Sequence, residues 1–279
     1  MSNHESALSR ACLLARRSVK RGFILLLTQV VILDMIGFIV FKCDFMSESE
    51  KTAPLKHLAI IMDGNRRWAK ERGMISSKGH AAGYDRLVQV GDWCLDRGIK
   101  VLTVFAFSTE NWKRTQDEVG FLMDLLEKAF AEELMKFGDK GARIKVIGRR
   151  DNLRPSVLRA IEKAEEETKD NTRATFCICF NYGGRLEIVD ACKKLVESGI
   201  PSDQIDEAAI QSAMYWPDMP DPDLIVRTSG EERMSGFLLW EGAYSEFYWC
   251  QKHWPDFDEA ELDKVLEAYS IRKRRFGGS

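Results

Sequence analysis

Short apolar runs alternate with amphipathic segments from about residue 55 to the end of the chain. Each run is typical of a buried strand, and six strands are predicted, at Leu58–Met62, Val101–Phe107, Arg143–Ile147, Ala174–Phe180, Leu224–Arg227 and Gly236–Trp240. Apolar residues at helical spacing predict helices at Tyr84–Arg97, Asp117–Phe137, 155–169, Leu186–Val196, Asp203–Met214 and Asp258–Tyr269. Thr115 and Glu118 form a predicted capping box before the second helix. This alternation predicts one α/β domain whose central, mostly parallel sheet of about six strands is flanked by helices.

Polar clusters directly follow four of these predicted strands. The clusters are Asp63–Arg67, Ser108–Arg114, Asn181–Arg185 and Arg227–Arg233. The carboxyl ends of parallel strands meet at one edge of a sheet, and ligands of open α/β sheets bind at that edge. Because the clusters carry arginines, hydroxyls and amides, they indicate a site for multiply charged phosphates.

The first cluster combines groups suited to a metal ion and to an anion. Asp63 offers the hard oxygen ligands that Mg2+ prefers, and Gly64 allows close approach of the backbone to a phosphate. A helix is expected to start at Trp68, so free N–H groups would also favour an anion here. Asp-Gly-Asn alone is equally typical of a surface turn. The arginines that follow a buried strand favour the phosphate site.

Composition limits the kinds of partner. The chain has 279 residues, 45% of them hydrophobic, which is enough for a full core. A net charge of −2 argues against a general nucleic-acid binder, so the local arginines must serve a smaller anion. There are seven cysteines but no Cys-x-x-Cys, a pattern that favours a reducing compartment without a zinc site or a disulfide framework.

Residues 1–50 differ from the rest and are predicted to be an N-terminal extension that precedes a single domain at residues 51–279. A basic cluster precedes the apolar run Gly22–Phe41, which is long enough to span a bilayer, although Asp34 makes a membrane position costly. In a membrane-spanning helix, the basic cluster before the apolar run would stay in the cytosol, so the rest of the chain would cross the membrane. A Mg2+- and phosphate-dependent enzyme is instead expected in the cytoplasm. Two other interpretations are therefore favoured: a segment associated with the membrane surface, or translation from Met46.

Motifs between His57 and Gly278 occur in a specific order. They are His57–Asn65, Gly79–Gly83, Phe107–Arg114, Asn181–Arg185, Asp223–Glu231, Phe237–Trp240, Ala243–Glu246, Trp254–Phe257 and Arg274–Gly278. In this order they resemble the cis-prenyltransferases, the isoprenyl transferases typified by undecaprenyl pyrophosphate synthase. The resemblance implies a homodimeric, Mg2+-dependent transferase. Such enzymes condense isopentenyl pyrophosphate with an allylic pyrophosphate, such as farnesyl or geranyl pyrophosphate, to a cis-polyprenyl pyrophosphate.

The resemblance also assigns roles to individual residues. Asp63 would be catalytic and would share the metal with Glu246, while Asn111 would assist proton removal. The allylic pyrophosphate and its cleft would involve Gly64, Asn65, Arg66, Arg67, Trp68, His80, Ser108, Thr109, Glu110, Trp112 and Arg114. Isopentenyl pyrophosphate would be held by Arg227, Arg233, Met234 and Ser235.

Several questions stay open at this point. Arg66, Ser76 and Gly236 depart from the usual pattern of undecaprenyl enzymes, and large Phe176 and small Ala106 give opposite indications about the tunnel for the product. Product length and the preferred allylic substrate are therefore not predicted. A second hypothesis is a non-catalytic partner subunit of such an enzyme, but those subunits lack the metal aspartate. A third, a phosphatase or nucleotide-binding enzyme, has no Walker loop or Gly-x-Gly-x-x-Gly in support.

Overall fold

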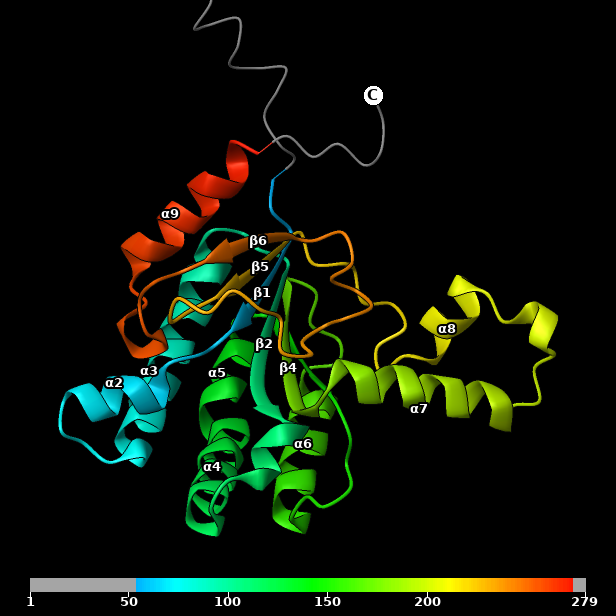
Figure 1. Ribbon diagram of the computed structural model, residues 1–279, viewed down its shortest axis with the longest axis horizontal. Helices are drawn as coiled ribbons and strands as arrows, with labels where there is room; N and C mark the ends of the chain where they lie inside the picture. The colour runs from blue at the N-terminus through cyan, green and yellow to red at the C-terminus, as the bar shows by residue number, and fades with distance from the viewer. Residues whose placement is uncertain (1–53, 273–279) are drawn as a thin grey trace, which may run out of the picture. The chain divides into compact units, whose positions relative to one another are not determined.

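A single six-stranded parallel sheet forms the centre of the protein in the computed structural model, which describes residues 54–272 (Figure 1). The strands are β1 (His57–Ile61), β2 (Val101–Ser108), β3 (Ala142–Ile147), β4 (Ala174–Tyr182), β5 (Leu224–Arg227) and β6 (Glu246–Trp249). Their order is β3-β4-β2-β1-β5-β6, and every neighbouring pair is parallel. The predicted fold class is therefore confirmed.

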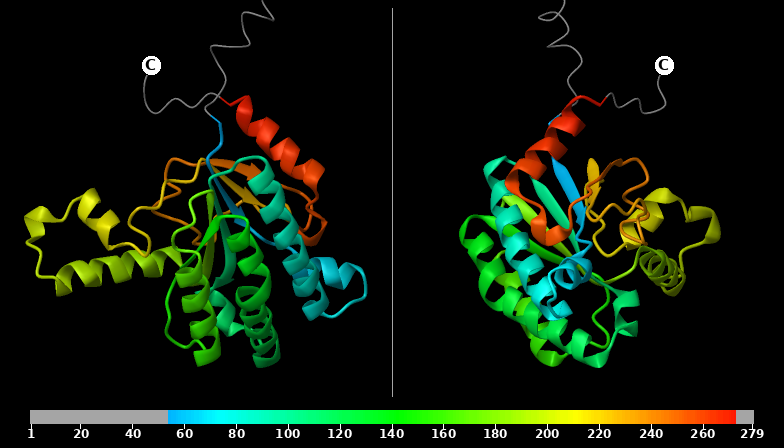
Figure 2. Two further views of the ribbon diagram at one scale, coloured as in Figure 1. Left: turned by 180° about the vertical axis from the view of Figure 1, so that it is seen from behind. Right: turned by 60° about the vertical axis from the view of Figure 1, so that its left-hand side comes forward.

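The two faces of the sheet are covered differently. Alternate residues of β1 point to opposite sides, so Leu58 and Ile60 join one buried cluster while Ala59 and Ile61 join another. The first cluster packs against the long helices, which cover this face of the sheet (Figures 1 and 2). The second cluster packs against irregular chain around Met219 and Phe237.

The helices of the first face are α3 (Ser76–Asp96), α4 (Gln116–Lys128), α5 (Leu134–Asp139), α6 (Pro155–Glu167) and α9 (Glu259–Ser270). The short α2 (Asn65–Glu71) directly follows β1. Helix α3 begins eight residues before the prediction, at Ser76, because small residues let its first turns pack closely on α2. The predicted helix Asp117–Phe137 is two helices, joined by a π-helical turn at Ala129–Glu133.

Helices α7 (Gly184–Glu197) and α8 (Glu207–Ala213) pack on each other and extend away from the sheet (Figures 1 and 2). The predicted helix Asp203–Met214 is wrong over its first residues. Ser202–Gln204 form a 3₁₀ turn, and Asp206 then caps α8 by accepting a hydrogen bond from the N–H of Ala209.

The predicted sixth strand, Gly236–Trp240, is also wrong. Phe237 and Leu238 are fully buried, and Leu239 and Trp240 are partly buried, which explains why the sequence resembles a strand. The backbone cannot be extended, however, because Gly236 and Leu238 have positive φ angles of 80° and 42°. The sixth strand is instead β6, which starts at Glu246.

The predicted membrane-surface segment, residues 22–41, and the alternative start at Met46 lie outside the described residues. Within residues 54–272, no helix combines the length and the apolar character that crossing a bilayer requires.

Candidate active site

A cleft of about 750 Å³ opens where β1 ends and α2 begins. Its walls are Met62, Asp63, Gly64, Asn65, Arg66, Arg67, Lys70, Met74, Ile75, Ser76, His80 and Arg114. Seven residues predicted for the site line it together, namely Asp63, Gly64, Asn65, Arg66, Arg67, His80 and Arg114. Three arginines and a lysine face one carboxylate, so the cleft is suited to an anion.

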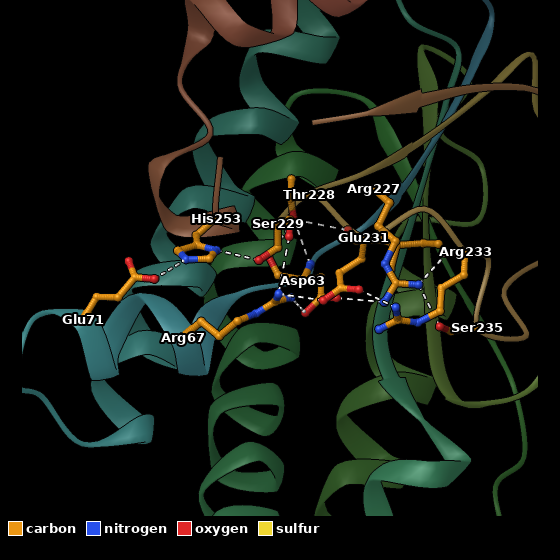
Figure 3. A network of polar contacts seen from close by, with 11 residues as sticks. Asp63, Arg67, Glu71, Arg227, Thr228, Ser229, Glu231, Arg233, Ser235 and His253 are labelled. Carbon is orange, nitrogen blue, oxygen red and sulfur yellow. Dashed lines mark hydrogen bonds and ion pairs between the residues drawn. The ribbon is translucent and has the colours of Figure 1, made fainter. Parts of the chain in front are cut away.

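Asp63 is held between two guanidinium groups (Figure 3). Its Oδ2 accepts a hydrogen bond from Nη2 of Arg227 at 2.8 Å, and its Oδ1 lies 3.2 Å from Nη2 of Arg67. Burial raises the pKa of Asp63, but the hydrogen bond and charge of Arg227, together with Arg67, outweigh burial and hold this pKa below its usual value. Asp63 is therefore a carboxylate at neutral pH.

The backbone of Asp63 is fixed from two neighbouring segments. Its N–H donates to Oγ1 of Thr228 at 2.9 Å, and its C=O accepts from the same hydroxyl at 2.7 Å. The N–H of Trp254 donates to the same C=O at 3.0 Å. Because Thr228 follows β5, this contact joins the ends of two adjacent strands.

Glu231 joins the arginines of the two predicted pyrophosphate subsites (Figure 3). Its carboxylate lies 2.7 Å from Nη1 of Arg67 and also pairs with Arg233. Arg227 donates to the C=O of Arg233 and, at 2.7 Å, to Oγ of Ser235. The structure thus brings these predicted residues into one network, together with Glu231, which was not among the predicted site residues.

A second network surrounds Glu118, which contacts three residues of the cleft wall. Its Oε1 lies 3.1 Å from Nε2 of His80, 3.0 Å from Nη1 of Arg114 and 3.8 Å from Nε of Arg66. Thr115 caps α4 as predicted, but the side chain of Glu118 bonds these cleft residues instead. Burial lowers the pKa of His80 and outweighs its hydrogen bond to Glu118, so the imidazole is neutral at neutral pH.

The residues after β2 form a capped 3₁₀ turn, η1 (Thr109–Lys113), and none of them lines the cleft. Oδ1 of Asn111 accepts from the N–H of Ser108 at 3.0 Å, and Trp112 donates to Oδ1 of Asn181 at 2.8 Å. Glu110 is exposed and pairs with Lys113.

Six other predicted residues also lie outside the cleft walls, and three of them, Arg227, Arg233 and Ser235, belong to the network around Asp63. Trp68 donates to Oδ1 of Asp256 at 2.7 Å, and Met234 packs against the second buried cluster. Glu246 is not brought to Asp63 within this chain, because β6 pairs Glu246 with Leu224 and Trp249 with Arg227. Glu246 therefore lies roughly 10 Å back along the sheet from the level of Arg227, toward the opposite edge.

The residues present fit a magnesium ion that is shared with a bound phosphate. Mg2+ is often held by one or two carboxylates together with substrate phosphates rather than by a complete protein cage. Asp63 supplies one such carboxylate in the cleft. Within residues 54–272, no three or more His, Cys, Asp or Glu side chains cluster so that they could hold a metal alone.

Comparison with known proteins identifies relatives over nearly the whole described part of the chain. Residues 61–277 match the prenyltransferase family whose model describes undecaprenyl diphosphate synthase. Curated isoprenyl transferases are similar along almost their full length. The Thermotoga maritima protein is 48% identical over 80% of this chain and 97% of its own. The Fusobacterium nucleatum protein is 50% identical over 82% of this chain and 98% of its own.

Solved structures give the same assignment. A lavandulyl diphosphate synthase from Lavandula x intermedia, in complex with dimethylallyl diphosphate, superposes with a TM-score of 0.76 at 36% identity. The alignment covers 80% of this chain and 98% of the plant protein. A probable undecaprenyl diphosphate synthase from Campylobacter jejuni gives a TM-score of 0.69 at 32% identity, covering 81% of this chain and all of that protein.

Proposed function

Because this chain belongs to the undecaprenyl diphosphate synthase family and is an isoprenyl transferase, we propose that it condenses isopentenyl pyrophosphate with an allylic pyrophosphate in a Mg2+-dependent reaction. C4 of isopentenyl pyrophosphate attacks C1 of the allylic substrate, pyrophosphate leaves C1, and a proton leaves C2. The new double bond is cis. The dimethylallyl diphosphate bound by the plant neighbour supports an allylic diphosphate as one substrate.

One observation carries the proposal: Asp63 lies between Arg67 and Arg227 in a cleft whose other charged walls are mostly cationic. Two pyrophosphates bring several negative charges into this small space. Charge-assisted hydrogen bonds from guanidinium groups offset such charge. They also stabilise the negative charge that develops on the leaving pyrophosphate in the transition state. The same contacts orient the two reacting carbons, which supplies a large part of the acceleration in reactions of two substrates.

We assign the allylic pyrophosphate to Arg67 and its neighbours Gly64 and Asn65, and isopentenyl pyrophosphate to Arg227, Arg233 and Ser235. Glu231 is the acceptor that joins Arg67 and Arg233. Because Glu231 pairs with one arginine of each subsite, the two subsites are adjacent and share one acidic neighbour. Substrate phosphates would compete with Glu231 for these guanidinium groups. Asn111 is assigned to proton removal, which requires its amide to turn from Ser108 toward substrate.

Asp63 would hold Mg2+ together with pyrophosphate oxygens, and the ion would supply charge stabilisation to the leaving group. Glu246 remains a proposed second ligand, which this chain alone does not bring to Asp63. By family resemblance we also propose a homodimer acting in the cytoplasm.

The test is condensation by the purified chain. Labelled isopentenyl pyrophosphate is incubated with dimethylallyl, geranyl or farnesyl pyrophosphate, with Mg2+ or with a chelator. We expect labelled polyprenyl pyrophosphate only with Mg2+, and chromatography and NMR of the product give its length and double-bond geometry. No condensation with any of the three primers would overturn the proposal. Activity that appears only when an active relative is added would instead favour the non-catalytic partner subunit.

A further inference from the structure

Three side chains that have no individual role in the predicted site are connected by two successive hydrogen bonds beside the cleft (Figure 3). Oγ of Ser229, after β5, lies 2.5 Å from Nδ1 of His253. Nε2 of the same imidazole lies 2.9 Å from Oε1 of Glu71, the last residue of α2. No motif of the family resemblance assigns a role to these residues, and His253 precedes the Trp254–Phe257 motif by one position.

With a neutral imidazole, these three hydrogen-bonded side chains have one consistent arrangement of donors and acceptors. A carboxylate only accepts, so Nε2 of His253 carries the hydrogen that bonds Glu71. Nδ1 is then the acceptor, and the hydroxyl of Ser229 donates to it. The imidazole thus fixes the direction of the Ser229 hydroxyl, and Glu71 fixes the imidazole.

The Ser229–His253 pair lies directly against the loop between Asp63 and Asn65. A Cβ placed on Gly64 would lie 2.6 Å from Oγ of Ser229 and 2.7 Å from Nδ1 of His253. Only a residue without a side chain can therefore occupy this position, whose φ is +104°. Packing against Gly64 limits movement of the loop that lines the cleft.

The same pair reaches a cleft arginine and both ends of α2. The C=O of Ser229 accepts from Nη1 of Arg67 at 3.4 Å. Helix α2 has seven residues and is therefore about 10 Å long, with Gly64 before its first residue and Glu71 as its last. His253 contacts Glu71 directly and lies against Gly64, so it holds the short helix at both ends relative to the strand ends.

We propose that His253 is a positioning residue which, through Ser229 and Glu71, holds Gly64 and Arg67 in the arrangement that binds the pyrophosphate of the allylic substrate. The inference rests on the proposed function for the identity of that substrate. The expected binding of pyrophosphate itself does not depend on the proposed function. Loss of the hydrogen bonds should weaken pyrophosphate binding and leave the chemical step at saturation largely unchanged.

The test compares His253→Leu, which removes both hydrogen bonds, with His253→Asn, whose amide keeps an acceptor for Ser229. The Kd of inorganic pyrophosphate is measured by calorimetry, and KM and kcat for the allylic substrate by steady-state assay. We expect His253→Leu to raise both Kd and KM roughly tenfold, as the loss of one or two hydrogen bonds predicts. kcat should stay within about threefold, and His253→Asn should recover part of the affinity.

Ser229→Gly separates the hydroxyl from the backbone. Ser229 has a left-handed φ of 79°, which glycine adopts without strain, so this variant should melt at the same temperature or higher. The inference expects weaker pyrophosphate binding despite that stability. Ser198→Ala is the matched control, since Ser198 donates only to a helix carbonyl, that of Leu195 at 2.7 Å, away from the cleft. Its pyrophosphate affinity should equal that of the unmodified protein.

The outcomes distinguish this inference from the proposed function. Unchanged pyrophosphate Kd in both His253→Leu and Ser229→Gly would overturn the inference even if condensation is active. A protein that binds pyrophosphate but condenses no primer would overturn the proposed function, while a raised Kd in these variants would still support the positioning role. Melting curves show whether His253→Leu is folded, and His253→Asn gives the decisive comparison if it is not.

Discussion

At the scale of single residues, Asp63 and Arg227 compensate each other's charge in the candidate site. The Arg227 side chain is 5% exposed, and its Nε is buried without a hydrogen-bond partner among residues 54–272. A buried guanidinium that loses its carboxylate is strongly destabilising, because its charge then has no compensation. Removing the whole Asp63 side chain would therefore mix a loss of stability with a loss of activity.

Asp63→Asn separates the two effects, because asparagine keeps an acceptor for Arg227 but lacks the charge. We expect kcat/KM for condensation to fall by at least about 100-fold, the usual consequence of losing one preorganised electrostatic group. Steady-state assays at saturating Mg2+ measure this, with the melting temperature as the control for folding. Activity within tenfold of the unmodified enzyme would contradict the role of Asp63.

Arg233→Ala tests the assignment of the two subsites. The Arg233 side chain is 58% exposed and pairs with Glu231, so its removal should cost little stability. We expect the KM of isopentenyl pyrophosphate to rise about 10-fold or more, because a charge-assisted hydrogen bond to that substrate is lost. The KM of the allylic substrate should change little. If only the allylic KM rises, the subsites are assigned the wrong way round.

Glu241 predicts a pH dependence of stability. It is 1% exposed, and burial, together with the nearby charge of Glu187, raises the pKa of Glu241 from 4.5 to about 8. Since the folded state holds this proton more tightly than the unfolded state, the contribution of Glu241 to stability should be lost as pH rises from about 4.5 to about 8. We expect Glu241→Gln to weaken this loss and to raise the melting temperature at pH 8.5. If the melting temperatures of both proteins change in the same way between pH 5 and pH 8.5, the assignment of this pH dependence to Glu241 is contradicted.

The sequence is sufficient to bring together those candidate residues whose position follows from the backbone alone. Asp63 and Arg227 each come at the end of a strand, so parallel pairing of β1 with β5 is sufficient to bring them together. Glu231 and Glu118 were missed because their roles depend on side chains that reach across the cleft from other elements. Glu246 was expected to share the metal with Asp63, but the register of β6 decides where it lies within this chain, and no local pattern specifies register between distant strands.

At the scale of secondary-structure elements, five strands were predicted within two residues. Four of them contain the apolar run between polar turns that is typical of a buried parallel strand, whereas β3 alternates apolar residues with Arg143 and Lys145. The false strand, Gly236–Trp240, shares that pattern, since residues buried in irregular chain are equally apolar. The true β6 is half-buried at the sheet edge and reads Glu-Phe-Tyr-Trp, with no long apolar run. Burial and strand conformation are thus separate properties, and the sequence reports mainly the first.

Close packing of α2 on α3 is the element-scale feature that the cleft requires. A Cβ on Gly79 would lie 2.0 Å from the backbone oxygen of Asn65, so Gly79→Ala must displace α2. We expect this variant to melt at a lower temperature and to bind inorganic pyrophosphate at least several-fold more weakly. Calorimetry and melting curves measure both quantities.

Gly120→Ala is the matched control for this substitution. Gly120 is also helical, but its added Cβ would meet only one side chain, that of Arg154, at 3.7 Å. Removing a flexible glycine from a helix should therefore stabilise the protein by about 0.5–1 kcal/mol without affecting pyrophosphate binding. Equal effects of the two substitutions would show that the contact between α2 and α3 does not control the site.

At the scale of the whole molecule, the described residues contain every element of the candidate site. The walls of the cleft lie between Met62 and Arg114, and the arginine network extends to Ser235. The match to the family likewise covers residues 61–277. All the residues named for these features come after residue 53, whereas the apolar run Gly22–Phe41 lies outside the described residues.

We therefore expect a chain that starts at Met46 to condense short, water-soluble primers with kcat and KM within about threefold of the full chain. The same pair of proteins, mixed with vesicles of anionic and neutral phospholipids, tests the separate role of the apolar run. The full chain should sediment with vesicles, because burying an apolar run of this length in lipid is strongly favourable, and the truncated chain should stay in the supernatant. Dimethylallyl pyrophosphate is the primer of choice, since its short chain reaches both proteins equally with or without lipid. An inactive but folded truncation beside an active full chain would show that residues 1–45 contribute to the catalytic domain itself.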